Sequence, residues 1–154
     1  MSTYVPNPIA SSAANIRRAR IRAGKSRAET AAHLALNPAW YDDLEQRDGE
    51  LAATLTLFQG VALAELFGLR LADLFGETVP DGERMALPDL PERIRAHLTA
   101  AGISLEQFEE QLGWELGPFL AAPVQLSTEL PIAFFQALAE ALGVHWLLLV
   151  PDAS

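Results

Sequence analysis

The amino-acid sequence predicts an all-α protein made of two small helical bundles in tandem. Half of the 154 residues are apolar, and Ala and Leu dominate while β-branched residues are sparse, which favours helices over strands. Most Pro and Gly residues fall between segments with helical apolar periodicity. The chain also repeats its own helical plan, and its length suffices for two cores of roughly 65 to 75 residues each.

The internal repeat divides the chain. Shifts of 78 and then 75 residues superpose apolar residues, capping residues and glycines in the same order. The matched pairs include Ile16 with Ile94, Gly24 with Gly102, Ser26 with Ser104, Leu34 with Leu112, Ala62 with Ala137 and Gly68 with Gly143. This pattern indicates a degenerate duplication. We therefore expect a first domain at 1–78, a turn-rich linker at 79–90 and a second domain at 91–154.

The first three expected helices have clear boundaries. A helix over 12–23 ends at Gly24, which can adopt the left-handed conformation of a helix stop. Ser26 and Glu29 have the spacing of a capping box, and they open a second helix that ends near residue 36. Asn37 caps the third helix. Pro38 takes its first position, where a missing N–H costs nothing.

Two further helices complete the first bundle. A longer helix is expected over 55–67, with its face formed by Phe58, Val61, Ala62, Glu65 and Leu66. A short helix over 69–75 then closes the bundle with Leu71 and Leu74.

The second half repeats this order. Helices are expected over 91–101 and, after a capping box at Ser104 and Gln107, up to residue 112. The third element at 114–119 contains Gly117 and Pro118, so a helix there is short or distorted. The last helices are expected over 131–142 and 144–150. The apolar segment 146–150 either caps the second core or contributes to a dimer face.

Composition argues against catalysis and against metal or membrane binding. The chain has no Cys, and its three His residues lie far apart in sequence, so a metal site is not expected. It contains neither a Gly-x-Ser-x-Gly elbow nor a His-Glu-x-x-His pair. No apolar run approaches the ~20 residues of a membrane helix. We expect a cytoplasmic protein that is not an enzyme and needs no cofactor.

The net charge of −9 is unevenly distributed. Residues 1–78 hold 8 cations against 9 acids, a net charge of −1, whereas residues 79–154 hold 3 cations against 11 acids, a net charge of −8. Six of the cations lie within residues 17–27. Any affinity for a polyanion must therefore come from the first half.

The first half resembles the Xre family of Cro- and repressor-like helix-turn-helix proteins. The resemblance covers residues 16–75, and residues 94–150 match more weakly. It rests on Ile16-Arg-Arg-Ala-Arg20, Ala23-Gly-Lys-Ser26, Glu29-Thr-Ala31, Leu34-Ala-Leu36, Leu44-Glu45, Leu63-Ala-Glu-Leu-Phe-Gly68, Leu71 and Leu74. The family resemblance implies two tandem bundles of the lambda-repressor-like helix-turn-helix type, the second being degenerate from about residue 92 to 150.

The resemblance also implies a structural ion pair between Arg20 and Glu45. Such a partly buried pair fixes helix packing more than it adds stability, because desolvation offsets the attraction. In the second half, Leu98 replaces Arg20 and the region of Pro123 replaces Glu45. The joint loss of both partners favours a structural role for Arg20 over contact with a phosphate.

In this family the third helix enters the major groove and the start of the second helix contacts a phosphate. Carried onto this sequence, the phosphate contact is Arg27, and Asn37, Ala39, Trp40 and Asp43 face base edges. Asn can read adenine, and an acid can accept a hydrogen bond from cytosine. The expected DNA-binding residues are Arg17, Arg18, Lys25, Arg27, Asn37, Ala39, Trp40, Asp43 and Arg47.

Acidic residues around the third helix keep a second function open. Asp42, Asp43, Asp48 and Glu50 lie near Arg47, which leaves little positive charge toward DNA. The arginine run could equally be a solvated helix face whose charges balance those of nearby acids. An outward Trp40 flanked by acids suits a protein contact, although packing against the linker or the second half is an equal alternative.

Two functions follow from these patterns. The first is a cytoplasmic DNA-binding transcriptional regulator that occupies double-stranded DNA without catalysis, with a second domain that serves association as a homodimer or partner binding. The second is a protein-interaction module that has lost DNA binding, as an antitoxin, adaptor or inhibitor would.

Overall fold

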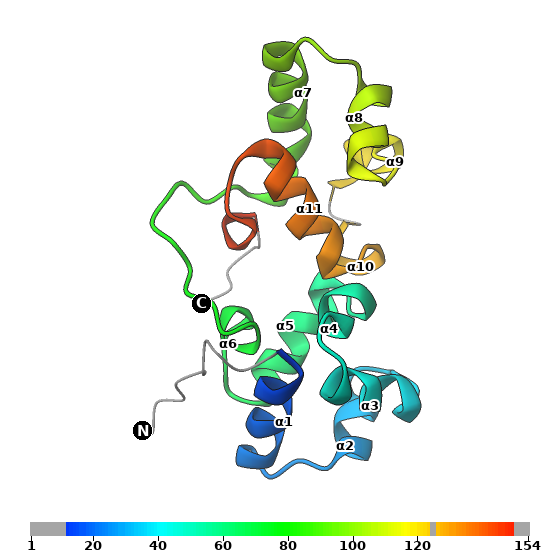
Figure 1. The fold of residues 1–154 in the computed structure, drawn as a ribbon, viewed down its shortest axis with the longest axis vertical. Helices are drawn as coiled ribbons and strands as arrows, with labels where there is room; N and C mark the ends of the chain where they lie inside the picture. Colours follow the sequence, from blue (N-terminus) through cyan, green and yellow to red (C-terminus); the bar gives the residue numbers. More distant parts are fainter. Residues whose placement is uncertain (1–11, 124–125, 150–154) are drawn as a thin grey trace.

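The computed structural model describes residues 12–123 and 126–149, and their regular elements are helices, with no strand among them (Figure 1). The all-α prediction is therefore confirmed. The helices of the first half are α1 (Ser12–Arg22), α2 (Arg27–His33), α3 (Pro38–Gln46), α4 (Glu50–Thr54), α5 (Leu57–Leu66) and α6 (Leu71–Leu74). None of the described helices has the length and apolar character to cross a membrane.

The second half follows the same order. Its elements are the 3-10 helix η1 (Leu87–Asp89), α7 (Leu90–Ala101), α8 (Leu105–Leu112), α9 (Gly117–Ala121), α10 (Leu126–Glu129), α11 (Ile132–Leu142) and the 3-10 helix η3 (Trp146–Leu148). The expected last helix is thus a single 3-10 turn, and Val150 lies outside the described residues. The third element is short, as expected, but it begins at Gly117 with Pro118 in its first turn.

Corresponding positions of the two halves share their local backbone. Gly24 and Gly102 are both left-handed, with φ of 71° and 67°. Ser26 and Ser104 are both N-caps with a complete capping box, and their φ and ψ angles agree within one degree. Ile16 and Ile94 are both buried. The sequence repeat therefore corresponds to a repeat of structure at these positions.

Two short helices and the face of a longer one differ from expectation. The sequence did not predict α4 or α10. Helix α5 begins at Leu57 because Thr56 and Gln59 form a capping box. The predicted face of this helix was wrong, since Phe58 is 65% exposed while Leu57, Gly60 and Leu63 are buried. The buried face is therefore offset by one residue from the predicted one.

One continuous apolar core extends through both halves. At their junction, α4 packs on α11 and α5 packs on α10. The short segments before α5 and α11 run antiparallel, with a bridge between Thr56 and Pro131. There the Ile132 amide donates to the Leu55 carbonyl at 2.9 Å. The two halves thus meet through their own main chains as well as through side chains.

The segment expected as a linker also packs against the rest of the chain. The Met85 amide donates to the Leu148 carbonyl at 2.9 Å, and Leu87 is buried. The Trp146 ring meets Phe75 edge-on at 4.9 Å, and its Nε1 donates to Glu77 Oε2 at 2.8 Å. Of the two roles expected for segment 146–150, its described residues take the first, because they cap the core.

Candidate nucleic-acid interface

Helices α2 and α3 pack together across a tight turn and form one unit. The turn contains Ala35 with a φ of 55°, which is uncommon for a residue other than Gly. Asn37 accepts a hydrogen bond from the Ala39 amide at 2.8 Å through Oδ1, and Pro38 opens α3 as expected. Gln59 Nε2 on α5 donates to the Leu34 carbonyl at 3.2 Å and holds the turn in place.

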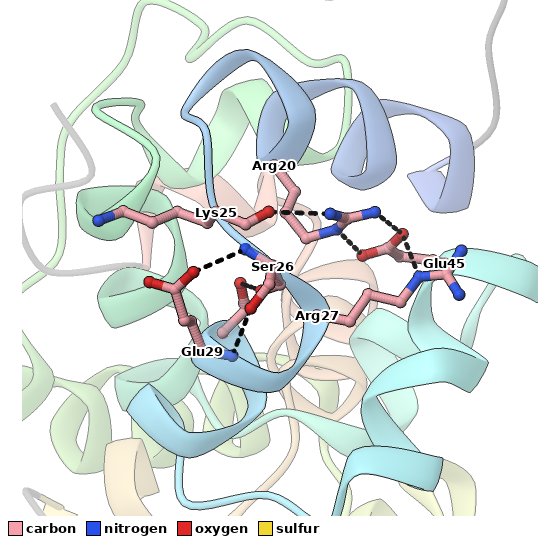
Figure 2. Close-up of polar contacts among 7 residues, drawn as sticks. Arg20, Lys25, Ser26, Arg27, Glu29 and Glu45 are labelled. Carbon is pink, nitrogen blue, oxygen red and sulfur yellow. Dashed lines mark hydrogen bonds and ion pairs between the residues drawn. The ribbon is translucent and has the colours of Figure 1, made fainter.

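A cluster of charges joins α1, α2 and α3 behind this unit (Figure 2). Arg20 Nε lies 2.6 Å from Glu45 Oε2, and Arg20 Nη2 donates to Glu45 Oε1 at 3.1 Å, so the expected pair is present and bidentate. Arg20 Nη1 also donates to the Lys25 carbonyl at 2.9 Å. This cluster ties the start of α2 to the end of α3 and fixes the angle between them.

Burial of the Glu45 carboxyl opposes its ionisation, yet the hydrogen bonds from Arg20 lower the pKa of Glu45 below its ordinary value. The hydrogen bond to Glu45 likewise raises the pKa of Arg20 against its own desolvation. Neighbouring Tyr41 is fully buried, and burial raises the pKa of its phenol. Arg20 and Glu45 therefore stay charged and Tyr41 stays neutral throughout the physiological range.

Arg27 joins the same carboxylate, which sequence reasoning missed. Its Nε lies 3.5 Å from Glu45 Oε1, and its side chain is 46% exposed (Figure 2). Glu45 already neutralises Arg20, so the three groups carry a net positive charge. Arg27 presents that charge at the first residue of α2, where a phosphate contact was expected.

The predicted base-facing residues lie together on the outer side of α3. Asn37, Ala39 and Trp40 are exposed, whereas Asp43 is half-buried. Trp40 is 61% exposed, so it does not pack beneath the linker or the second half. Together with Asp43, Glu50 and Thr54 it lines a shallow hollow of about 370 Å³.

The remaining predicted cations come from α1, from the turn that follows it and from the end of α3. Arg47 is exposed at the end of α3, and Lys25 is half-buried between α1 and α2. Arg17 and Arg18 are exposed on α1, where they line a separate hollow with Glu45, Gln46 and Asp48. Glu45 thus contributes to the hollow beside Arg17 and Arg18 and also pairs with Arg27.

The corresponding edge of the second half has different chemistry. Under the 78-residue shift, Leu105 stands in place of Arg27, Ile103 in place of Lys25 and Glu115 in place of Asn37. Glu106, Glu110 and Glu115 are exposed there. Glu109 turns inward, and its Oε2 accepts a hydrogen bond from the Leu116 amide at 2.6 Å. This edge offers carboxylates where the first half offers Arg27.

No group of His and acidic side chains in the described parts of the chain is arranged to hold a metal ion. A hollow of about 680 Å³ lies between the segment around Met85 and helices α7 and η3. It is open, and its charged side chains include Glu83, Arg84, Glu92 and Arg93.

A scan against protein-family models found no matching family, and searches of curated proteins and of solved structures found no match to this chain.

Proposed function

We propose that the chain is a non-catalytic regulator of Xre-like type that binds double-stranded DNA in the cytoplasm through α2 and α3. The observation that carries this proposal is the α2–turn–α3 unit, braced from behind by Arg20 and Glu45, with the outer side of α3 left uncovered. In a helix-turn-helix protein this is the side that enters the major groove.

The charge on this unit supports weak rather than tight binding. Arg27 supplies a cation at the start of α2, where helix-turn-helix proteins contact the backbone, and Arg47 supplies another beyond α3. Strong binders make six to ten phosphate contacts, and the first half cannot turn all of its cations toward one duplex. Asp43 and Glu50 reduce the attraction further.

Replacing one cation tests this assignment. We expect Arg27→Ala to weaken binding to every duplex sequence and to reduce the slope of log affinity against log salt by about one. Arg95→Ala, which removes an exposed cation from α7, is the matched control and should leave the slope unchanged. Fluorescence anisotropy with labelled duplexes at low salt measures both. If the two variants had the same affinity and the same salt slope, α2 would not be part of the DNA interface.

A second candidate function is supported by the hollow at Trp40. A large exposed indole beside two carboxylates suits a cationic protein segment, because a cation can lie over the ring and pair with the acids. The function would then be that of a protein-interaction module such as an antitoxin, adaptor or inhibitor. In an affinity measurement with a co-purified partner, Trp40→Ala should weaken the complex while Phe58→Ala, which removes another exposed aromatic ring, should not.

A further inference from the structure

The junction between the two halves joins residues that correspond in the internal repeat. Thr56 and Pro131 are related by the 75-residue shift, and they are bridged to each other in antiparallel orientation. Each is also the N-cap of a helix, α5 in the first half and α11 in the second. A two-fold axis that passes between two corresponding residues places them in contact and makes their segments antiparallel.

The helices around this bridge obey the same relation. Helix α4 corresponds to α10, and α5 corresponds to α11. The packing of α4 on α11 is therefore equivalent, under the repeat, to the packing of α10 on α5. In Figure 1, α3 and α9 lie on the same side of the molecule at opposite ends of its long axis, as the third helices of a two-fold helix-turn-helix pair would.

Gly60 shows that the surface used in this pairing is already occupied. A Cβ at Gly60 would lie 2.7 Å from Ile132 Cδ1 of the other half and 3.0 Å from Leu71 Cδ1. Leu55, Leu57 and Ile132 are fully buried at the same junction. A second copy of the chain cannot use this surface while the two halves of one chain cover it.

We infer that one chain acts as a built-in pair in which a single half reads DNA, so that a monomer occupies one half-site of a duplex. This inference rests on the proposed function. The α2–α3 edge carries Arg27, whereas the matching α8–α9 edge carries Glu106, Glu110 and Glu115 in exposed positions. In a two-fold pair of such units, the second half would face the neighbouring major groove, about 34 Å away, where its carboxylates repel the phosphates.

The stoichiometry and the footprint test the inference together. Sedimentation equilibrium should give a monomer without DNA and one chain per duplex with it. Hydroxyl-radical footprinting on a duplex selected from random sequences should show protection at one half-site. Two chains per site, or two protected half-sites one helical turn apart, would overturn the inference and leave the proposed function intact. Failure to bind any duplex at low salt would instead overturn the proposed function and the half-site assignment with it.

A charge reversal tests the placement of the second half directly. In Glu106→Arg with Glu115→Arg, we expect a salt slope steeper by about two and new protection one helical turn from the first. Asp81→Arg with Glu83→Arg changes the net charge equally at exposed positions outside the α8–α9 edge. This control should neither steepen the salt slope nor produce new protection. Circular dichroism checks that both variants keep their helices. An unchanged footprint in the first variant would show that α8 and α9 do not face the duplex.

Discussion

At the scale of single residues, the Arg20–Glu45 pair joins α1 to α3 and so braces the α2–α3 unit. The side chain of Glu45 is 1% exposed and that of Arg20 11% exposed. Removing one partner leaves a buried charge without its main counterion, which is far more costly than replacing both by apolar groups. The pair therefore fixes an arrangement of helices, and its net contribution to stability is small.

We expect Arg20→Ala to lower the free energy of unfolding by about 3 kcal/mol, because Glu45 would lose its bidentate partner and keep the longer contact with Arg27. The double variant Arg20→Met with Glu45→Leu should be less destabilised than the single variant. Urea denaturation followed by circular dichroism measures both. A double variant that unfolds more readily than Arg20→Ala would show that the pair is a net source of stability.

Acid should weaken this pair. Because the folded-state pKa of Glu45 lies below the ordinary value of 4.5, the pair's contribution is fully present above that value and is lost as the pH falls through the folded pKa. The stability difference between the native chain and Glu45→Gln should therefore shrink when unfolding is measured below about pH 4.5. A difference that stays constant from pH 7 down to pH 3 would contradict the assignment.

Residue patterns predicted much of this site. Cap chemistry predicted the capping residues Ser26 and Asn37, and the resemblance to the Xre family implied an outward Trp40. The sequence did not predict that Arg27 reaches Glu45, since that contact depends on how α2 lies across the end of α3. Distances between helices are set by packing, which no local pattern encodes.

At the scale of elements, strong caps marked the helices that sequence reasoning placed correctly. Helix α4 was missed because it has five residues and its N-cap, Gly49, makes no side-chain hydrogen bond. The buried face of α5 was missed because it includes Leu57 in place of the adjacent Phe58. Adjacent residues of a helix point about 100° apart, so an offset of one residue selects another face.

The contact of α5 with α11 gives a prediction about packing. We expect Gly60→Leu to lower the free energy of unfolding by about 1–3 kcal/mol, since a larger side chain must displace Ile132 and Leu71. Glu65→Leu, at an exposed position on the same helix, should change it by less than about 0.5 kcal/mol. Thermal denaturation compares the two variants. Equal stabilities would mean that the junction accommodates the larger side chain without loss of stability.

At the scale of the whole molecule, two halves with different surface chemistry share one core. The repeat in the sequence indicated that the halves are alike, but it held no signal for the way they meet. The segments that carry the bridge between Thr56 and Pro131 are short and lack a strand pattern. What the sequence did predict at this scale is the division of charge, with a net −1 in residues 1–78 and −8 in residues 79–154.

The division of charge makes the salt dependence of duplex binding the most direct measurement of the central claim, that the first half binds DNA through α2 and α3. Two to four phosphate contacts would give a slope of log affinity against log salt of about −2 to −4. We predict a slope in this range for the native chain, with binding detectable at low salt. Affinity that does not change with salt, or no retention of any duplex at low salt, would contradict the account.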